Sequence, residues 1–259
     1  MNRVKRLFKH LRSENRCCVI AYVTCGDPDP ATTPRIVEEL ERAGADAIEL
    51  GLPFSDPIAD GPTLQASATR SLKHGGSVAS ALGVARKLRG KLRAPVVTMG
   101  YMNPIESMGL RGFAAALRDA GIAGCIVPDL PLEEAAPLRE ELDAAGVDLV
   151  PLVAPTTPME RAAAIAKLAR GFVYTVSVTG VTGARTEFPP DLAARLRELR
   201  AISSLPVAVG FGIARPVQAA ALRGLVDGIV VGSALVAAHH EGGVAKATEL
   251  VRGLKAALQ

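Results

Sequence analysis

Short apolar segments alternate along the chain with longer amphipathic ones. Eight of the apolar segments are rich in valine and isoleucine and show no regular alternation with polar residues. That pattern is typical of strands covered on both faces, as in parallel sheets. The segments are residues 17–23, 46–51, 94–100, 124–129, 147–153, 171–178, 205–211 and 227–233. We therefore predict eight buried parallel strands.

The segments between these strands carry apolar residues at helical spacing. In residues 32–44, Ile36, Val37 and Leu40 share one face of a helix. Comparable patterns occupy residues 77–90, 110–120, 133–145, 158–169, 191–203, 215–223 and 243–258. Four of these helices are followed by a glycine of the kind that ends a helix in the left-handed conformation, namely Gly44, Gly121, Gly146 and Gly224.

Eight strands, each followed by a helix, in 259 residues predict a (β/α)8 TIM barrel. A doubly wound open sheet is the structural alternative. No linker or change in composition divides the chain, so we expect residues 1–259 to form a single barrel domain. Before the first strand, Val4, Leu7, Phe8 and Leu11 recur at helical spacing and predict an extra N-terminal helix.

The composition narrows the class of protein. Hydrophobic residues make up 49% and charged residues 22%, which excludes a disordered chain. The net charge of +4 comes from residues 1–16, which carry +5, so the body is close to neutral. With 3% aromatic residues and no tryptophan, a nucleic-acid partner is not expected. No apolar segment has the roughly 18 residues of a membrane span. Four cysteines without a C-x-x-C pair favour the reducing cytoplasm.

Two acidic residues near the end of the second strand are candidates for acid–base chemistry. In a TIM barrel the chemistry lies at the C-terminal ends of the strands. Glu49 lies within an apolar strand, where burial raises a carboxyl pKa; the alternative is a head group that reaches solvent at the rim. Asp60 lies in the long proline-containing loop 49–62, which also holds Asp56. We expect Asp60 to stay ionised on a polar loop, although either aspartate could be an ordinary turn residue.

Glycines at the ends of the last strands indicate a phosphate site. Gly210-Phe211-Gly212 ends the seventh strand and Gly232-Ser233 ends the eighth. Backbone N–H groups there can approach an anion, and these loops form the usual phosphate site of barrels. The sixth strand leads from Tyr174 into a Gly/Thr-rich segment at 178–183, which suits a lid, a phosphate contact or a plain loop.

The remaining side chains limit the chemistry. None of the four histidines lies at a strand end, so a histidine-ligated metal is not expected. No lysine lies at a strand end, so a Schiff base is not expected. The residues alone thus indicate carboxylate acid–base chemistry on a phosphorylated small molecule, without a cofactor.

Eight motifs, in order over essentially the whole chain, resemble those of the tryptophan synthase alpha chain family. The most specific are ELGLPFSDPIADGPTLQ (49–65) and SVTGVTGAR (177–185). The others are AYVTCGDP (21–28), GYMNPI (100–105), PDLPLEE (128–134), APTTP (154–158), VGFGI (209–213) and VVGSA (230–234).

The resemblance implies a lyase that cleaves indole-3-glycerol phosphate to indole and D-glyceraldehyde 3-phosphate. It implies that Glu49 is the general acid/base, that Asp60 binds the indole N–H, and that Tyr174 supports the active site. The residues implied to hold the phosphate are Gly183, Gly212, Gly232 and Ser233, with Gly210 and Phe211 nearby. The residues implied to line the indole pocket are Tyr22, Met99, Ile126 and Leu152.

The resemblance also implies a partner, the tryptophan synthase beta chain, in a complex of two alpha and two beta chains. Pyridoxal phosphate is expected only on the beta chain. Segments 53–62 and 178–188 of this chain are expected to face the beta chain. Two other functions stay open. A barrel that only activates the beta chain is disfavoured by the intact Glu49 and Asp60. A different phosphate-binding barrel, such as an isomerase of a ribulose phosphate derivative, would need acid–base groups at other strand ends.

Overall fold

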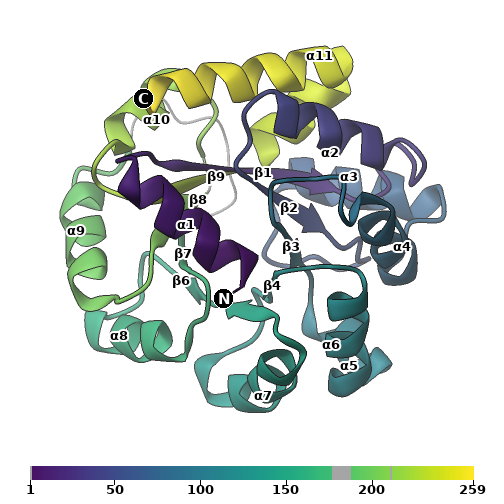
Figure 1. Cartoon of the computed structure of the whole chain (residues 1–259), viewed down its shortest axis with the longest axis horizontal. Coiled ribbons are helices and arrows are strands. Elements are labelled where there is room, and N and C mark those ends of the chain that lie inside the picture. The colour runs from purple at the N-terminus through teal and green to yellow at the C-terminus, as the bar shows by residue number, and fades with distance from the viewer. Residues whose placement is uncertain (1, 177–187, 211) are drawn as a thin grey trace.

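The computed structural model describes residues 2–176, 188–210 and 212–259, and within them it forms a ring of parallel strands surrounded by helices (Figure 1). The strands are β1 (Cys18–Thr24), β2 (Ala47–Gly51), β3 (Val96–Met99), β4 (Gly124–Ile126), β5 (Asp148–Val150), β6 (Leu152–Val153), β7 (Val173–Val176), β8 (Val207–Gly210) and β9 (Gly228–Val231). Every pairing is parallel, and β1 pairs with both β2 and β9. The predicted TIM barrel is confirmed, and the open-sheet alternative is wrong.

Pro151 divides the fifth predicted strand into two short ones. β5 pairs with β4, and β6 pairs with β7, so the sheet order ends at β5 and β6. Proline has no backbone N–H and interrupts a ladder of hydrogen bonds. The chain itself continues through Pro151, so eight predicted strands appear as nine elements around one barrel.

The helices fill the connections between strands. They are α1 (Arg3–Ser13), α2 (Thr33–Arg42), α3 (Pro62–Lys73), α4 (Val78–Leu88), α5 (Met102–Met108), α6 (Leu110–Asp119), α7 (Ala135–Ala145), α8 (Met159–Leu168), α9 (Leu192–Ile202), α10 (Pro216–Leu222) and α11 (Ser233–Ala257), with a 3-10 turn η1 (Leu132–Glu134) before α7. The sequence pattern missed α3, α5 and the part of α11 before its break at Gly242 and Gly243. The four predicted helix-ending glycines all have positive φ, between 74° and 111°.

The strands are buried on both faces, as the unbroken apolar segments predict. One cluster fills the inside of the barrel and includes Ile20, Val97, Ile126 and Val150. A second packs the outer faces of the strands against the helices and includes Val19, Ile48 and Leu149. Adjacent residues of one strand thus face two different apolar layers, so no polar alternation is needed.

The N-terminal helix α1 closes the end of the barrel where the strands begin (Figure 1). Val4, Phe8 and Leu11 are buried and pack into the inner cluster. The ring of Phe8 lies 5.5 Å from that of Phe172, which precedes β7. The predicted N-terminal helix is therefore confirmed, with its apolar face against the bottom of the barrel.

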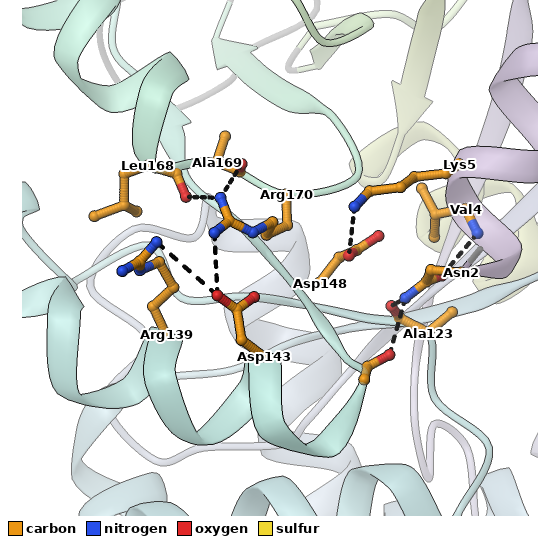
Figure 2. Close-up of polar contacts among 11 residues, drawn as sticks. Asn2, Val4, Lys5, Ala123, Arg139, Asp143, Asp148, Leu168, Ala169 and Arg170 are labelled. Carbon is orange, nitrogen blue, oxygen red and sulfur yellow. Dashed lines mark hydrogen bonds and ion pairs between the residues drawn. The ribbon is translucent and has the colours of Figure 1, made fainter.

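The positive charge of the N-terminal segment pairs with carboxylates at the starts of strands. Lys5 Nζ lies 3.8 Å from Asp148 Oδ1 at the start of β5, and Figure 2 draws this ion pair. Arg12 pairs with Asp227, and Arg16 with Asp46, and these aspartates directly precede β9 and β2. Three of the basic residues in 1–16 thus pair with carboxylates of the barrel.

A second set of contacts fixes the start of α1 to the barrel. The Asn2 side chain accepts a hydrogen bond from the Val4 N–H, which caps the helix. Its amide donates to the Ala123 carbonyl oxygen at 2.7 Å and to that of Gly146 at 3.1 Å (Figure 2).

Among the described helices none is long and apolar enough to cross a membrane.

Candidate functional site

A cavity of about 270 Å³ opens at the C-terminal end of the barrel. Four of its side chains come from four different strands: Tyr22 (β1), Glu49 (β2), Met99 (β3) and Tyr174 (β7). Its other lining residues are Asp60, Gly61, Thr63, Leu64, Gly212, Ile213, Ala214, Val230, Gly232, Ser233, Ala234 and Ala237. The predicted carboxylates, two predicted aromatic residues and three predicted phosphate-site residues therefore share one cavity.

Glu49 is a buried carboxyl on the wall of this cavity. Its exposed fraction is 1%, and no described residue forms a hydrogen bond with its Oε2 atom. Burial raises the pKa of Glu49 to about 8, and the neighbouring charge of Asp60 adds to the rise. At pH 7 the carboxyl is therefore mainly protonated, and it can act as a proton donor.

Asp60 lies at the end of the loop between β2 and α3, directly before Gly61, the cap of α3. The sequence predicts a polar loop here, but in the structure Asp60 is buried, with an exposed fraction of 7%. Burial raises its pKa to about 6. The carboxylate still remains mostly ionised at pH 7. The cavity thus holds a neutral and an ionised carboxyl, the arrangement that separates an acid from an electrostatic partner.

All three tyrosines of the chain surround Asp60. Burial raises the pKa of Tyr22, Tyr101 and Tyr174, and the charge of Asp60 contributes to the rise in each. Tyr22 and Tyr174 line the cavity, whereas Tyr101 does not, and its role was not predicted from the sequence. Its position two residues after the third strand, at a strand end of a barrel, was the signal available for finding it.

The start of α11 forms one side of the cavity. The first hydrogen bonds of this helix run from Leu235 and Val236 to the carbonyl oxygen of Gly232. The N–H groups of Ser233 and Ala234 precede these bonds, so they are placed as helix N-terminal donors for an anion. A Cβ on Gly232 would lie 3.7 Å from the nearest atom, Tyr22 Cβ, which is an ordinary van der Waals contact, so a methyl group fits at this position.

Several predicted residues lie elsewhere. Ile126 is fully buried in the inner cluster and does not line the cavity. Leu152 lines a separate hollow near β6 and α8. Gly210 does not line the cavity either, because the ring of Tyr174 covers it. Gly183 and Phe211 lie outside the described residues.

Within the described ranges, no three histidine, cysteine, aspartate or glutamate side chains are grouped so as to hold a metal ion. All four cysteines are free and buried. Burial raises the pKa of Cys17, Cys25 and Cys125 to about 12, which keeps these thiols protonated at neutral pH.

The chain is similar to known proteins over almost its whole length. The family model for the tryptophan synthase alpha chain matches residues 8–258. The tryptophan synthase alpha chain of Citrifermentans bemidjiense is 49% identical over 236 residues, which cover 91% of this chain and 88% of that one. That of Picosynechococcus sp. is 44% identical over 263 residues and covers 100% of both.

Solved structures agree with these sequence relatives. The crystal structure of tryptophan synthase subunit alpha from Legionella pneumophila superposes with a TM-score of 0.91 at 35% identity and covers 100% of this chain and 98% of that one. A chain of Mycobacterium tuberculosis tryptophan synthase superposes with a TM-score of 0.91 at 36% identity and covers 99% and 98%.

Proposed function

Because the chain belongs to the tryptophan synthase alpha chain family, we propose that it is the lyase that cleaves indole-3-glycerol phosphate into indole and D-glyceraldehyde 3-phosphate in tryptophan biosynthesis. The observation that carries this proposal is the pair of buried carboxyls in one cavity, with a pKa of about 8 for Glu49 and about 6 for Asp60. A general acid and a fixed negative charge are what this cleavage requires.

The first step is protonation of the indole ring. The carbon–carbon bond can break only if the ring accepts the electron pair, and protonation at C3 makes the ring an indoleninium cation that can do so. Neutral Glu49 supplies this proton, since its carboxyl is protonated at pH 7. Ionised Asp60 accepts a hydrogen bond from the ring N–H and stabilises the positive charge that develops there.

Bond cleavage gives Glu49 a new proton, which comes from the substrate. Glu49, now a carboxylate, takes the proton of the side-chain hydroxyl next to the ring. The carbon–oxygen double bond of the aldehyde forms as the carbon–carbon bond breaks, and its electron pair restores the neutral indole ring. The proton at C3 stays on the product, so the step leaves Glu49 protonated for the next cycle.

The substrate phosphate is proposed to bind at the start of α11. We propose that backbone N–H groups at Gly232, Ser233 and Ala234, with Gly212, hold the phosphate. Gly183 and Phe211, outside the described residues, remain part of this proposal, as do Ile126 and Leu152 for the indole end. The phosphate anchors the substrate and leaves the two carboxyls to act on the ring.

We further propose that the chain works with a beta chain, in a complex of two alpha and two beta chains. Solved relatives are chains of tryptophan synthase, which supports a beta-chain partner. The loop that holds Asp60 presents Ile58 with an exposed fraction of 71%, an apolar group suited to a protein contact. The proposal places pyridoxal phosphate on the beta chain alone, no cofactor on this chain, and the complex in the cytoplasm.

The direct test is release of indole from indole-3-glycerol phosphate by the purified chain, alone and with increasing amounts of a cognate beta chain. We expect activity from the isolated chain and a higher rate with the partner, because contact orders the loops at the cavity mouth. A barrel that only activates the beta chain would release no indole in either case. An unchanged rate and hydrodynamic radius on titration would contradict the partnership.

A further inference from the structure

Tyr101 packs against the loop between β2 and α3, which carries Asp60. It lies two residues after β3 and directly before α5, and its exposed fraction is 3%. Its ring stacks on that of Phe54, with centroids 5.4 Å apart and planes inclined by 30°. Phe54 belongs to the loop between β2 and α3 that ends in Asp60. The Tyr101 side chain thus packs on the loop that ends in Asp60.

The hydroxyl of Tyr101 is a potential donor for the buried carboxylate of Asp60, and the backbone of Ala59 also acts on this hydroxyl. No described residue forms a hydrogen bond with the Tyr101 hydroxyl or with Asp60 Oδ1, and both atoms are buried. Buried polar atoms in folded proteins are nearly always paired, because an unpaired one loses its hydration without compensation. Burial raises the pKa of Asp60, and the Tyr101 hydroxyl opposes that rise. Tyr101 and Asp60 are therefore close enough to affect each other's pKa, and a small shift of either side chain would pair the two unsatisfied atoms.

We propose that Tyr101 is a positioning residue for Asp60: by a small shift, the Tyr101 hydroxyl donates a hydrogen bond to the Asp60 carboxylate and orients it toward the indole N–H. The ring stack on Phe54 fixes the hydroxyl in place, so the position of the loop governs this contact. The inference rests on the proposed function, because Asp60 needs an orientation only if the cavity takes an indole substrate.

Other groups around Asp60 do not provide the same support. Glu49 faces it from β2 and is mainly neutral, and Tyr22 and Tyr174 face it from β1 and β7 as part of the cavity wall. Asp129, the other charge near Tyr101, is engaged with the Met102 N–H at 3.1 Å. Tyr101 alone among these joins Asp60 to its own loop through a stacked ring.

The test is Tyr101→Phe, which keeps the stacked ring and removes only the hydroxyl. We expect the pKa of Asp60, measured by NMR of protein labelled with carboxyl-¹³C aspartate, to rise by about 1, the size of one hydrogen bond to a charged group. If it moves from about 6 to about 7, the ionised fraction and hence kcat/KM should fall roughly fivefold at pH 6 and hardly at pH 8.

The matched control is Thr98→Val, which removes another buried hydroxyl from the same strand region. Thr98 Oγ1 also forms no hydrogen bond with a described residue, and it is fully buried on β3 away from the cavity lining. We expect this variant to keep the pKa of Asp60 and the pH profile of the wild type. Phe54→Leu, which loosens the stack, should raise the pKa of Asp60 in the same direction as Tyr101→Phe but by less.

The outcomes separate this inference from the proposed function. A pKa of Asp60 that is the same in Tyr101→Phe as in the wild type overturns the inference. So does an equal loss of activity at every pH, which is the result expected from a merely structural role. If the wild type releases no indole, the proposed function fails, while the NMR titration still decides whether Tyr101 supports Asp60.

Discussion

The Tyr22 hydroxyl occupies the space in which a side chain at position 51 would begin. A Cβ on Gly51 would lie 2.2 Å from this oxygen. Gly210 stands in the same relation to Tyr174, at 2.3 Å from its hydroxyl. In each pair the glycine belongs to the neighbouring strand, β2 beside β1 and β8 beside β7. Glycine is thus required at both strand ends so that the two cavity tyrosines can lie flat across them.

Gly51→Ala should therefore destabilise the protein and reduce its activity. The ring of Tyr22 is fixed on the cavity wall, so the added methyl group must displace either the ring or the strand. Overpacking of this kind costs about 1–3 kcal/mol in free energy of unfolding. Urea denaturation followed by circular dichroism measures this change. A variant as stable as the wild type would show that the ring can move away freely.

Gly83→Ala is the matched control for that measurement. Gly83 lies within α4, and a Cβ there would meet no atom within 4 Å. Its φ angle is not in the left-handed region, since it is absent from the positive-φ glycines. We expect this substitution to stabilise the helix by about 0.5–1 kcal/mol, because alanine loses less backbone entropy than glycine.

The two carboxyls predict a bell-shaped dependence of kcat/KM on pH. Asp60 must be ionised, so activity should rise as the pH increases through about 6. Glu49 must be protonated, so activity should fall as the pH increases through about 8. The optimum is then expected near pH 7. A profile that is flat from pH 5 to pH 9 would contradict this assignment of the two protonation states.

Asp60→Asn should lower the pKa of Glu49. Burial is the main cause of the raised pKa, and the charge of Asp60 is the second cause, so removal of that charge makes ionisation of Glu49 easier. NMR of protein labelled with carboxyl-¹³C glutamate measures this pKa without the need for activity. An unchanged or increased value would show that the two carboxyls do not interact.

The strands and Glu49 could be predicted because each depends on local sequence. Strands buried on both faces are uniformly apolar, and a carboxylate among such residues is conspicuous. α3 was missed because its buried face includes serines. Ser71 Oγ donates to the Cys25 carbonyl oxygen at 2.6 Å, and Ser67 Oγ pairs with Thr24 Oγ1 at 2.6 Å. Polar residues satisfied in this way hide the helical pattern of apolar positions.

Contacts between strands could not be predicted, because they depend on register. A glycine at a strand end can admit a phosphate or the ring of a neighbouring residue, and the sequence does not distinguish Gly232 from Gly210. The same holds for Asp60, which is buried although it lies in a loop. Tyr101 meets Phe54 and Asp60 across 47 and 41 positions of the chain, and only the folded barrel brings them together.

Gly232→Asp should raise KM for the phosphorylated substrate by about tenfold or more, since tenfold corresponds to 1.4 kcal/mol of binding free energy. A Cβ at position 232 makes only ordinary van der Waals contacts, and a carboxylate attached to it would repel a phosphate held at the start of α11. Steady-state kinetics give the change in KM, with circular dichroism to check folding. Gly232→Ala is the control for size without charge. An unchanged KM in a folded Gly232→Asp variant would place the phosphate elsewhere.

The sharpest test of the acid–base assignment is Glu49→Gln. Glutamine keeps the shape of the side chain but cannot give or take a proton, and the phosphate still anchors the substrate. We therefore expect kcat to fall by about 10²–10⁴, the usual contribution of general acid–base catalysis, with KM nearly unchanged. Glu49→Asp should also retain little activity, because a donor one methylene shorter does not reach C3 of the indole ring. Asp60→Glu is the matched comparison, and we expect it to retain some activity, since the longer carboxylate can still approach the ring N–H. Steady-state release of indole measures all three variants. If Glu49→Gln keeps more than about a tenth of the wild-type kcat, Glu49 is not the acid–base group.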